Sequence, residues 1–235
     1  MHKKDAAKQP DNMDTANDCN VENETLRFQP YFSSARFDYF PPIEKFDKDC
    51  HELFCDDRVM LPFIPQLYNM EWSAFLSRRK NQRQSALKTS CFVDIVERKT
   101  GKFVGVTGFR EIRSEESNNK PTDDPTSNIC TSPRMASPMT AEYLIGISFE
   151  FQMKGICTEA FFEMLRFAKE RLNCTMVKGV TPTEHATMCK FFAKYGMDCV
   201  RNMFVDGAEK WGTRERLEFS VFIGNINHIL LQFTK

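Results

Sequence analysis

The sequence predicts an α/β (α+β) domain with a mixed, mostly antiparallel central sheet of about seven strands flanked by about four helices. Runs rich in Val, Ile, Phe and Thr predict strands, and segments whose apolar residues recur every three or four positions predict helices. The order of these elements is strand, two helices, three strands, helix, strand, helix, two strands. This order predicts a largely antiparallel sheet with one crossover in the middle of the chain.

Each element follows from its local pattern. We expect strands at residues 25–32, 90–97, 102–112, 141–151, 175–180, 198–205 and 216–223. The second and third are joined by RKTGK, in which Gly101 favours a hairpin turn. We expect helices at 43–56 and 68–84, and two more from the apolar stripes over 161–172 and 188–195. The last stripe ends at Gly196, as helices often do.

Two segments are too polar to bury a core. Residues 1–23 are rich in Asp, Asn and Lys and predict a disordered tail. Residues 113–140 have a similar composition and predict a flexible insertion in a surface loop. The globular domain is therefore expected over 24–223, followed by a C-terminal extension at 224–235.

The charge balance argues against polyanionic partners. Lys and Arg together number 32, as do Asp and Glu, so the 235-residue chain has a net charge of about zero. Proteins that bind nucleic acid or anionic membranes by bulk electrostatics usually carry a basic excess. We therefore expect neither partner. The sequence does not predict the oligomeric state.

The cysteine pattern predicts a reducing compartment and no metal site. The nine cysteines are scattered, with no C-x-x-C pair and no zinc-like quartet. No secretory signal and no run of 18 apolar residues is present. We therefore expect an intracellular protein, in the cytoplasm or nucleus, that is not secreted.

The segment FQMKGICTEAFF, residues 151–162, lies between a strand and a helix. The free N–H groups at the start of a helix favour anions, especially phosphates. Gly155 would let the backbone approach a ligand closely, and Lys154 adds a positive charge. The alternative is that Gly155 only makes the turn. Neither a P-loop nor a dinucleotide-binding fingerprint is present.

This segment and the order of elements carry a family resemblance. QMKGICTEA resembles motif A, R/Q-x-x-G-x-G/A, of the GNAT superfamily of acetyl-CoA-dependent N-acetyltransferases. The resemblance is greatest to the branch of ribosomal-protein N-terminal acetyltransferases (RimJ/RimL type) and covers about 24–223. Residues 52–60, ELFCDDRVM, are similar to the early helix-to-loop segment of that branch. Residues 180–197, VTPTEHATMCKFFAKYGM, are similar to its motif B.

The resemblance implies a GNAT-like fold and an acetyl-CoA site. It implies that the amides of the motif A segment hold the pyrophosphate of coenzyme A, and that the preceding strand pairs with the pantetheine arm. The implied cofactor-binding residues are Ile147, Ser148, Phe149, Gln152, Met153, Lys154, Gly155, Ile156, Cys157, Thr158, His185 and Phe192. An amine would then attack the thioester directly, with no covalent enzyme intermediate.

The sequence departs from the family pattern at several positions. Cys157 replaces the last small residue of motif A, and a thiol at a helix start is expected to have a lowered pKa. In motif B, His185 replaces Asn, Met188 replaces Ser, and Phe192 stands where other branches have a catalytic Tyr. Tyr195 is a weak substitute candidate for the general acid.

Two carboxylates are candidates for the general base. Glu142 lies at the start of the strand before the motif A segment, and Glu111 lies at the end of the preceding strand. The alternative is that both glutamates are ordinary charges at strand ends. His185 and Cys189 are one helical turn apart, but a pair of ligands is poor support for a metal site.

Three functions remain open at this point. The first is an N-acetyltransferase that moves an acetyl group from acetyl-CoA to a protein or peptide N-terminus or to a small amine. The second is a catalytically impaired acetyl-CoA sensor or interaction module, and the third is a structural domain without a ligand. Segments around 56–70 and 204–214 are expected to set the acceptor; Phe63, Tyr68 and Trp211 lie in them, and Trp72 lies just beyond the first.

Overall fold

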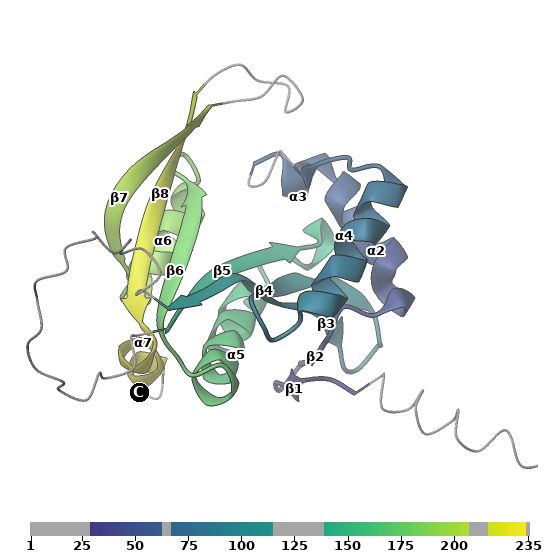
Figure 1. Ribbon diagram of the computed structural model, residues 1–235, viewed down its shortest axis with the longest axis horizontal. Helices are drawn as coiled ribbons and strands as arrows, with labels where there is room; N and C mark the ends of the chain where they lie inside the picture. The colour runs from purple at the N-terminus through teal and green to yellow at the C-terminus, as the bar shows by residue number, and fades with distance from the viewer. Residues whose placement is uncertain (1–28, 63–66, 115–138, 207–215, 234–235) are drawn as a thin grey trace, which may run out of the picture.

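The computed structural model describes residues 29–62, 67–114, 139–206 and 216–233 (Figure 1). The expected tail at 1–23 and most of the expected insertion at 113–140 lie outside the described residues. In the described part of the chain, no helix has both the length and the apolar character needed to span a membrane.

An eight-stranded sheet runs through the molecule in the order β1-β2-β3-β4-β5-β6-β8-β7. The strands are β1 (Phe32–Ser33), β2 (Phe37–Phe40), β3 (Cys91–Glu97), β4 (Phe103–Ser114), β5 (Met139–Ile147), β6 (Cys174–Pro182), β7 (Asp198–Asp206) and β8 (Arg216–Asn225). All neighbours are antiparallel except β5 and β6, which are parallel. The predicted fold class is confirmed, with eight strands instead of about seven.

The additional strand comes from a hairpin at the start of the domain. Of the strand expected at 25–32, residues 25–28 lie outside the described part of the chain, and of the described residues only Phe32 is in β1; the chain then turns back into β2, which was not expected. Ser34 N–H donates to the carbonyl of Phe37 at 2.8 Å and closes this turn. Pairs this short carry too little periodicity to predict.

The described residues form six α-helices, where about four were expected, and two 3₁₀ turns. They are η1 (Glu44–Phe46), α2 (Asp47–Cys55), α3 (Asp57–Met60), α4 (Trp72–Ser85), η4 (Phe149–Phe151), α5 (Ile156–Arg171), α6 (Ala186–Lys194) and α7 (Ile226–Phe233). The helix expected at 68–84 starts later than predicted, and the strand expected at 141–151 ends earlier, where η4 begins. The expected C-terminal extension contains α7, which we did not predict.

The helix expected at 43–56 is divided into η1 and α2, and a separate helix, α3, follows it. Asp56 is extended, with φ −81° and ψ 110°, and its side chain accepts a hydrogen bond from Arg58 N–H. An aspartate in this conformation caps a new helix instead of continuing the old one. Residues 44–55 therefore form η1 and α2, and α3 starts after the cap.

The helices cover both faces of the sheet (Figure 1). One hydrophobic cluster joins the sheet to α5, α6 and α7 and contains Tyr143, Phe161 and Ile229. A second, smaller cluster joins α2, α3 and α4 to Val106 of β4. Because side chains alternate along a strand, these clusters lie on opposite faces of β4 and β5.

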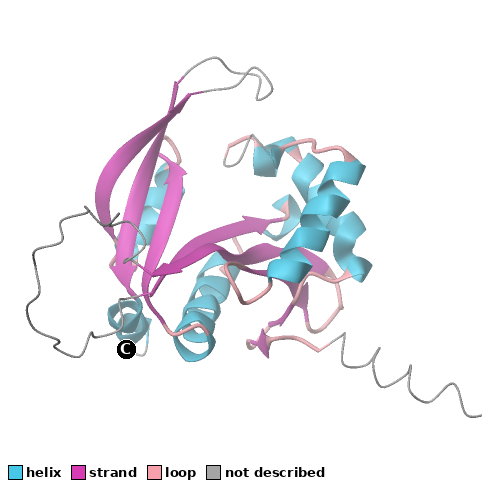
Figure 2. Cartoon of the chain, viewed as in Figure 1, coloured by secondary structure: helices cyan, strands magenta, loops and turns pink. Residues whose placement is uncertain are grey.

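The parallel strands β5 and β6 part before they end. Their pairing runs from Met139 opposite Cys174 to Tyr143 opposite Gly179, although β5 continues to Ile147. Beyond this point β6 turns away with β7 and β8, as Figure 2 shows. Phe192 of α6 lies at the point of parting, where a Cβ on Gly179 would be 2.6 Å from its Cζ.

Candidate functional site

A cavity of about 510 Å³ lies where β5 and β6 part. One part is lined by the end of β5, the segment 151–157, the end of β6 and the start of α6. The other part is lined by apolar side chains of α2, α3 and α4, which include Leu53, Phe54, Val59, Met60 and Phe75. The cavity therefore joins a region rich in backbone donors to an apolar chamber.

The free edge of β5 faces the parted strand. Ser148 N–H donates to the carbonyl of Val104 at 2.9 Å, so the Ser148 amide points toward β4. Residues alternate between the two neighbours in a sheet, so the amides of Ile145 and Ile147 point toward β6. No β6 residue pairs with β5 after Tyr143 among the described strands. Ile145 and Ile147 therefore offer strand-edge hydrogen bonds to a ligand in the gap.

The structure places the expected β5 residues in different roles. Ile147 lines the cavity, and its carbonyl accepts a hydrogen bond from Gln152 Nε2 at 3.1 Å. Ser148 and Phe149 do not line the cavity, and the Phe149 ring lies under the guanidinium of Arg58 at 4.3 Å. Ile145 was not among the expected cofactor-binding residues, because the register between β5 and β4 decides which β5 amides face the gap.

The segment 152–158 forms an uncapped helix start beside the gap. Gly155 has φ +73°, and a Cβ placed on it would have only one neighbour within 4 Å, Arg36 Nη2 at 3.8 Å. No side chain caps α5, and the amides of Ile156, Cys157 and Thr158 have no backbone acceptor among the described residues. Such amides and the helix dipole favour an anion by about 0.3–2 kcal/mol. The residues present therefore fit a phosphate group.

The side chains of this segment divide between the cavity and solvent. Met153, Ile156 and Cys157 line the cavity, although Met153 is also 96% exposed. Lys154 is exposed, with its ammonium 5.2 Å from the centre of the Phe151 ring. Thr158 Oγ1 points elsewhere and lies 3.4 Å from the hydroxyl of Tyr195.

Arg36 holds the helix start in place from the β1–β2 hairpin. Its Nη1 donates to the carbonyl of Lys154 at 3.0 Å, and its Nε donates to Glu159 Oε2 at 2.7 Å. Burial alone would raise the pKa of Glu159, but hydrogen bonds from Ser34 and Arg36 outweigh it and lower the pKa. Glu159 is therefore an ionised anchor. This contact could not be expected from the sequence, because its partners are far apart in the chain.

His185 and Phe192 approach the cavity from α6. His185 is the N-cap of that helix, and its Nδ1 accepts a hydrogen bond from Met188 N–H at 3.1 Å. Burial lowers the pKa of His185, which favours the neutral ring. Phe192 is 2% exposed and closes the cavity at the point where β5 and β6 part.

Cys157 is not an activated thiol. Its place in the first turn of α5 predicted a lowered pKa, but burial raises the pKa of the Cys157 thiol to about 12. The desolvation of the thiolate outweighs the helix dipole. The lowered-pKa expectation was wrong, and a covalent role gains no support.

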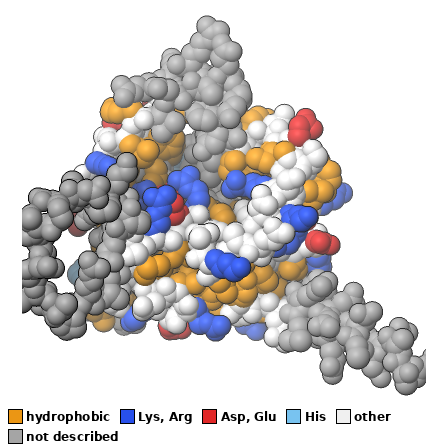
Figure 3. Space-filling model, viewed as in Figure 1, with side chains coloured by type: hydrophobic (Ala, Val, Ile, Leu, Met, Phe, Trp, Pro, Cys, Tyr) orange, Lys and Arg blue, Asp and Glu red, His pale blue; other side chains and the backbone are white. Residues whose placement is uncertain are grey.

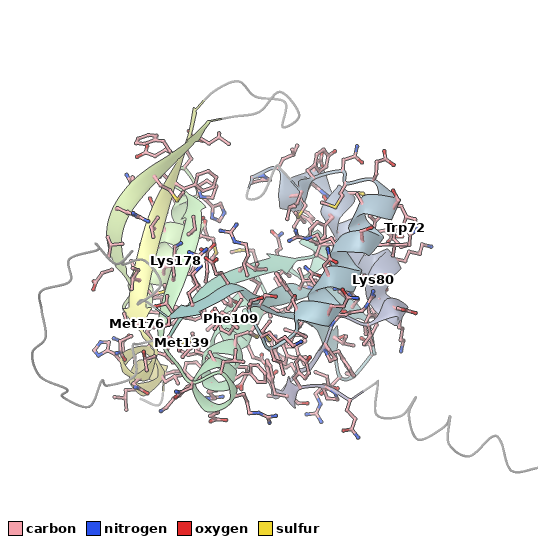
Figure 4. All side chains as sticks on the ribbon, viewed as in Figure 1. Trp72, Lys80, Phe109, Met139, Met176 and Lys178 are labelled. Atoms are coloured by element: carbon pink, nitrogen blue, oxygen red, sulfur yellow. The ribbon has the colours of Figure 1, made fainter. Side chains whose placement is uncertain are left out.

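The acid and base candidates lie outside the cavity lining. Tyr195 packs its ring against Phe161, Phe162 and Phe191. Glu142 is buried on β5 and bonded on both oxygens, to Lys178 Nζ at 2.7 Å and to Arg110. Figure 4 shows Lys178 on β6 beside β5.

Glu111, the second base candidate, makes an ion pair with Arg113. Neither Glu111 nor Glu142 nor any other Asp or Glu lines the cavity among the described residues.

A buried ion-pair network supports the apolar part of the cavity. Arg79 of α4 donates to both oxygens of Asp94 at 2.9 and 2.7 Å, and to Asp47 at 2.8 Å. Burial raises the pKa of Asp94 to about 6, although Arg79 opposes that shift. The network joins α4 to β3 and α2. The sequence did not reveal it, because a charged residue in a helix usually faces solvent.

The residues expected around the acceptor are only partly placed there. Trp72 lies on the side of α4 away from β6 and is 43% exposed (Figure 4). It stacks on Phe75, which does line the cavity. Tyr68 packs against the smaller hydrophobic cluster. Phe63 and Trp211 lie outside the described residues.

The described residues contain no group of three or more His, Cys, Asp or Glu arranged to hold a metal ion. Cys189, which with His185 formed the weak metal pair in the sequence, has its Sγ near the carbonyls of Pro182 and Thr183.

Comparison with known proteins identifies the family. Residues 39–198 match the family model described as an acetyltransferase (GNAT) domain. A comparison with curated proteins finds no match.

Solved structures share the fold at low identity. A spermidine N-acetyltransferase from Vibrio cholerae in complex with CoA and spermine is 10% identical, with 84% of this chain and 99% of that chain covered and a TM-score of 0.64. The microcin C7 self-immunity acetyltransferase MccE in complex with acetyl-CoA and AMP is 12% identical, with 86% and 99% covered and a TM-score of 0.63. RimL, the ribosomal L7/L12 α-N-protein acetyltransferase, in complex with CoA, is 10% identical, with 84% and 98% covered and a TM-score of 0.61.

These likenesses show the fold, and the family match, which spans most of the described domain, shows the family. The resemblance seen in the sequence is confirmed at that level: the chain belongs to the acetyltransferase (GNAT) domain family.

Proposed function

We propose that the protein binds acetyl-CoA between β5 and β6 and transfers its acetyl group to a primary amine. The observation that carries this proposal is the parted strand pair, which opens onto an uncapped helix start within one cavity. The related structures in complex with CoA or acetyl-CoA support it. Location in the cytoplasm or nucleus stays a prediction from the cysteine pattern.

The residues of this chain suit the parts of acetyl-CoA. The amides from Gly155 to Thr158 would hold the diphosphate. Ile145 and Ile147 would pair with the amides of the pantetheine arm, as in strand addition. A backbone N–H on this edge would also polarise the thioester carbonyl. Acetyl-CoA supplies an activated acetyl group, so the protein needs chiefly to position the amine.

Proton transfer is the least developed part of the site. Glu142 stays a candidate base, but it would first have to release Lys178 or Arg110. Because His185 Nδ1 accepts a hydrogen bond from its own helix, His185 serves as a cap and not as a proton acceptor. We propose that the neutral amine forms the C–N bond as the C–S bond of the thioester breaks, that water takes the proton from the nitrogen, and that CoA leaves as the thiolate and is protonated by water.

The missing base favours a second candidate function. A cavity that binds acetyl-CoA but lacks a carboxylate among its described lining would suit a sensor or interaction module. Turnover with an amine separates the two functions. The acceptor is not fixed by the related proteins, since one is a spermidine N-acetyltransferase and another acetylates a ribosomal protein.

The first test is calorimetric titration with acetyl-CoA. Gly155→Asp introduces a negative charge beside the diphosphate, and Gly155→Asn is the matched neutral control, because both residues tolerate φ +73° similarly. We expect micromolar binding to the unmodified protein. Gly155→Asp should raise the Kd for acetyl-CoA at least about tenfold more than Gly155→Asn, which corresponds to about 1.4 kcal/mol.

The outcomes divide the proposals clearly. Equal affinities for the Asp and Asn variants would show that the diphosphate lies elsewhere. No binding to folded protein would reject both the enzyme and the sensor. Binding followed by release of free CoA with an amine would establish the acetyltransferase.

A further inference from the structure

Arg78 is a cation without a counter-ion on the wall of the cavity. It lies on α4 between Phe75 and Gln82, at helical spacings that place all three on the cavity side. Its Nε is buried and has no hydrogen-bond partner, and the described residues offer its guanidinium no ion pair. Burial and the nearby charge of Arg110 lower the pKa of Arg78.

The neighbouring carboxylates are already engaged. Asp94 and Asp47 bond Arg79, and Asp47 also bonds Arg83. Glu142 bonds Arg110 and Lys178. Figure 3 shows basic side chains gathered near the middle of the face of the molecule that it displays. The region around Arg78 therefore carries an excess of positive charge.

An unpaired charge that is partly withdrawn from water is costly unless a ligand neutralises it. The diphosphate of acetyl-CoA is not placed to do so. The helix start lies at the β5 end that pairs with Val104, whereas Arg110 lies six residues further along β4. At about 3.3 Å per residue this is roughly 20 Å. Arg110 is near enough for its charge to act on Arg78. Arg78 therefore faces the acceptor part of the cavity and not the helix start.

We propose that the acceptor is a primary amine that carries a carboxylate on an apolar body, and that Arg78 binds the carboxylate. This inference rests on the proposed function. Guanidinium–carboxylate pairs are strong and directional in a cavity with little water. Gln82 lies one turn beyond Arg78 and can donate a further hydrogen bond. Phe75, Leu53 and Met60 offer an apolar surface for the rest of the acceptor.

The same arrangement disfavours polyamines. A polyamine carries several positive charges and needs carboxylates around it, but the described lining contains Arg78 and Arg79 and no Asp or Glu. The charge of Arg78 would repel such a substrate. The cavity therefore distinguishes acidic from basic amines.

The test compares acceptors in which an amide replaces the carboxylate, with kcat/KM expressed per neutral amine, because this replacement also lowers the pKa of the reacting amine. L-leucine and L-leucinamide form one pair, peptides that begin with Glu or Gln form a second, and spermidine represents polyamines. Turnover is followed as the release of free CoA. Arg78→Met removes the charge at similar length, Arg78→Lys keeps it, and Lys80→Met on the exposed side of α4 is the control (Figure 4).

We expect the unmodified protein to prefer the carboxylate member of at least one pair. Arg78→Met should lower kcat/KM for that member at least about tenfold and leave the amide member within about twofold, because only the carboxylate loses its partner. Arg78→Lys should retain part of the preference, and Lys80→Met should behave as the unmodified protein. Arg78→Met should also unfold at the same temperature or higher, since it loses an uncompensated charge.

Several results would overturn the inference. A preference for spermidine, or an equal loss for both members of a pair in Arg78→Met, would show that Arg78 does not read a carboxylate. Weaker acetyl-CoA binding by Arg78→Met would place Arg78 with the cofactor. If the protein binds acetyl-CoA but neither binds nor acetylates any carboxylate acceptor, this inference fails and the proposed cofactor site stands. If acetyl-CoA itself does not bind, the proposed function fails first.

Discussion

At the scale of single residues, His185 shows how a functional position becomes tied to local structure. Its Nδ1 accepts a hydrogen bond from the N–H of Met188, which also donates to the His185 carbonyl at 3.0 Å, so the ring adds a second acceptor at the start of α6. A protonated ring has no acceptor atom, so protonation would remove this cap. Because burial lowers the pKa of His185, the folded protein prefers the neutral ring.

This arrangement predicts a pH dependence of stability. The folded pKa lies below the ordinary value of 6.5, so the unfolded chain binds the proton more readily. The contribution of His185 is therefore complete above about pH 6.5 and is lost as the pH falls through the folded pKa. We expect His185→Asn, which keeps a capping side chain that does not titrate, to lose less stability between pH 7.5 and 5.

Urea unfolding at several pH values measures this difference. The free energy of unfolding is compared between the unmodified protein and His185→Asn at each pH, which cancels the contributions of the other titrating groups. Parallel pH profiles for the two proteins would contradict the role of His185 as a cap.

At the scale of elements, the network around Arg79 fixes α4 against β3 and α2. Both carboxylates that it bonds are buried, so removal of the arginine leaves Asp94 without a partner cation and leaves Asp47 with Arg83 alone. Breaking a buried pair in this way typically costs about 3–5 kcal/mol. We expect Arg79→Met to lose stability in that range, as measured by urea unfolding at neutral pH.

The control is an ion pair on the surface of a neighbouring helix. Lys48 and Glu52 lie 4.0 Å apart on α2, and both side chains are mostly exposed. Lys48→Met should leave the unfolding midpoint almost unchanged, because water screens this pair. A loss of similar size in both variants would argue that the Arg79 network does not stabilise the fold.

Elements with strong periodicity were predictable from the sequence, and those set by distant contacts were not. The central strands and α5 follow from alternation and from the stripe that begins at Phe161. The hairpin β1–β2 and the short helix α3 are too brief for a periodic signal. The helix α7 was missed, although its apolar residues Ile226, Ile229 and Leu230 lie at helical spacing.

The candidate site shows the same division. Gly155 and the uncapped amides that follow it could be expected from the local sequence, because both properties depend on neighbouring residues. That Ile145, and not Ser148, offers its amide to the gap could not be expected from the sequence. It depends on the register between β4 and β5 and on the bulge after Phe109. Nor could the pairing of Arg36 with Glu159, which joins residues 123 positions apart.

At the scale of the whole molecule, α7 completes the larger hydrophobic cluster. Ile226 and Ile229 are fully buried, and Phe233 stacks on Phe162 of α5 at 3.8 Å between ring centres. This helix follows β8 directly and packs against the crossover helix, so it holds the two parted halves of the sheet to one core. Its packing contributes to the stability of the whole fold.

Ile229→Ala tests this contribution. Truncation of a fully buried isoleucine costs about 2–5 kcal/mol, because it removes apolar contacts and leaves a cavity. Leu231→Ala on the same helix is the control, since Leu231 is 66% exposed. We expect a lower urea midpoint for Ile229→Ala and little change for Leu231→Ala. Equal midpoints for the two variants would contradict the role of α7 in the core.

The contact between Phe192 and Gly179 limits how this fold can vary. A Cβ at position 179 would lie 2.6 Å from Cζ of the Phe192 ring, the atom that carries the hydroxyl in a tyrosine. A tyrosine at 192 would therefore direct its hydroxyl at the backbone of β6 unless the ring moved. The two positions are expected to change together, and a side chain at 179 requires a smaller residue at 192. The close approach of β6 to the ring thus leaves little room for a larger side chain at either position.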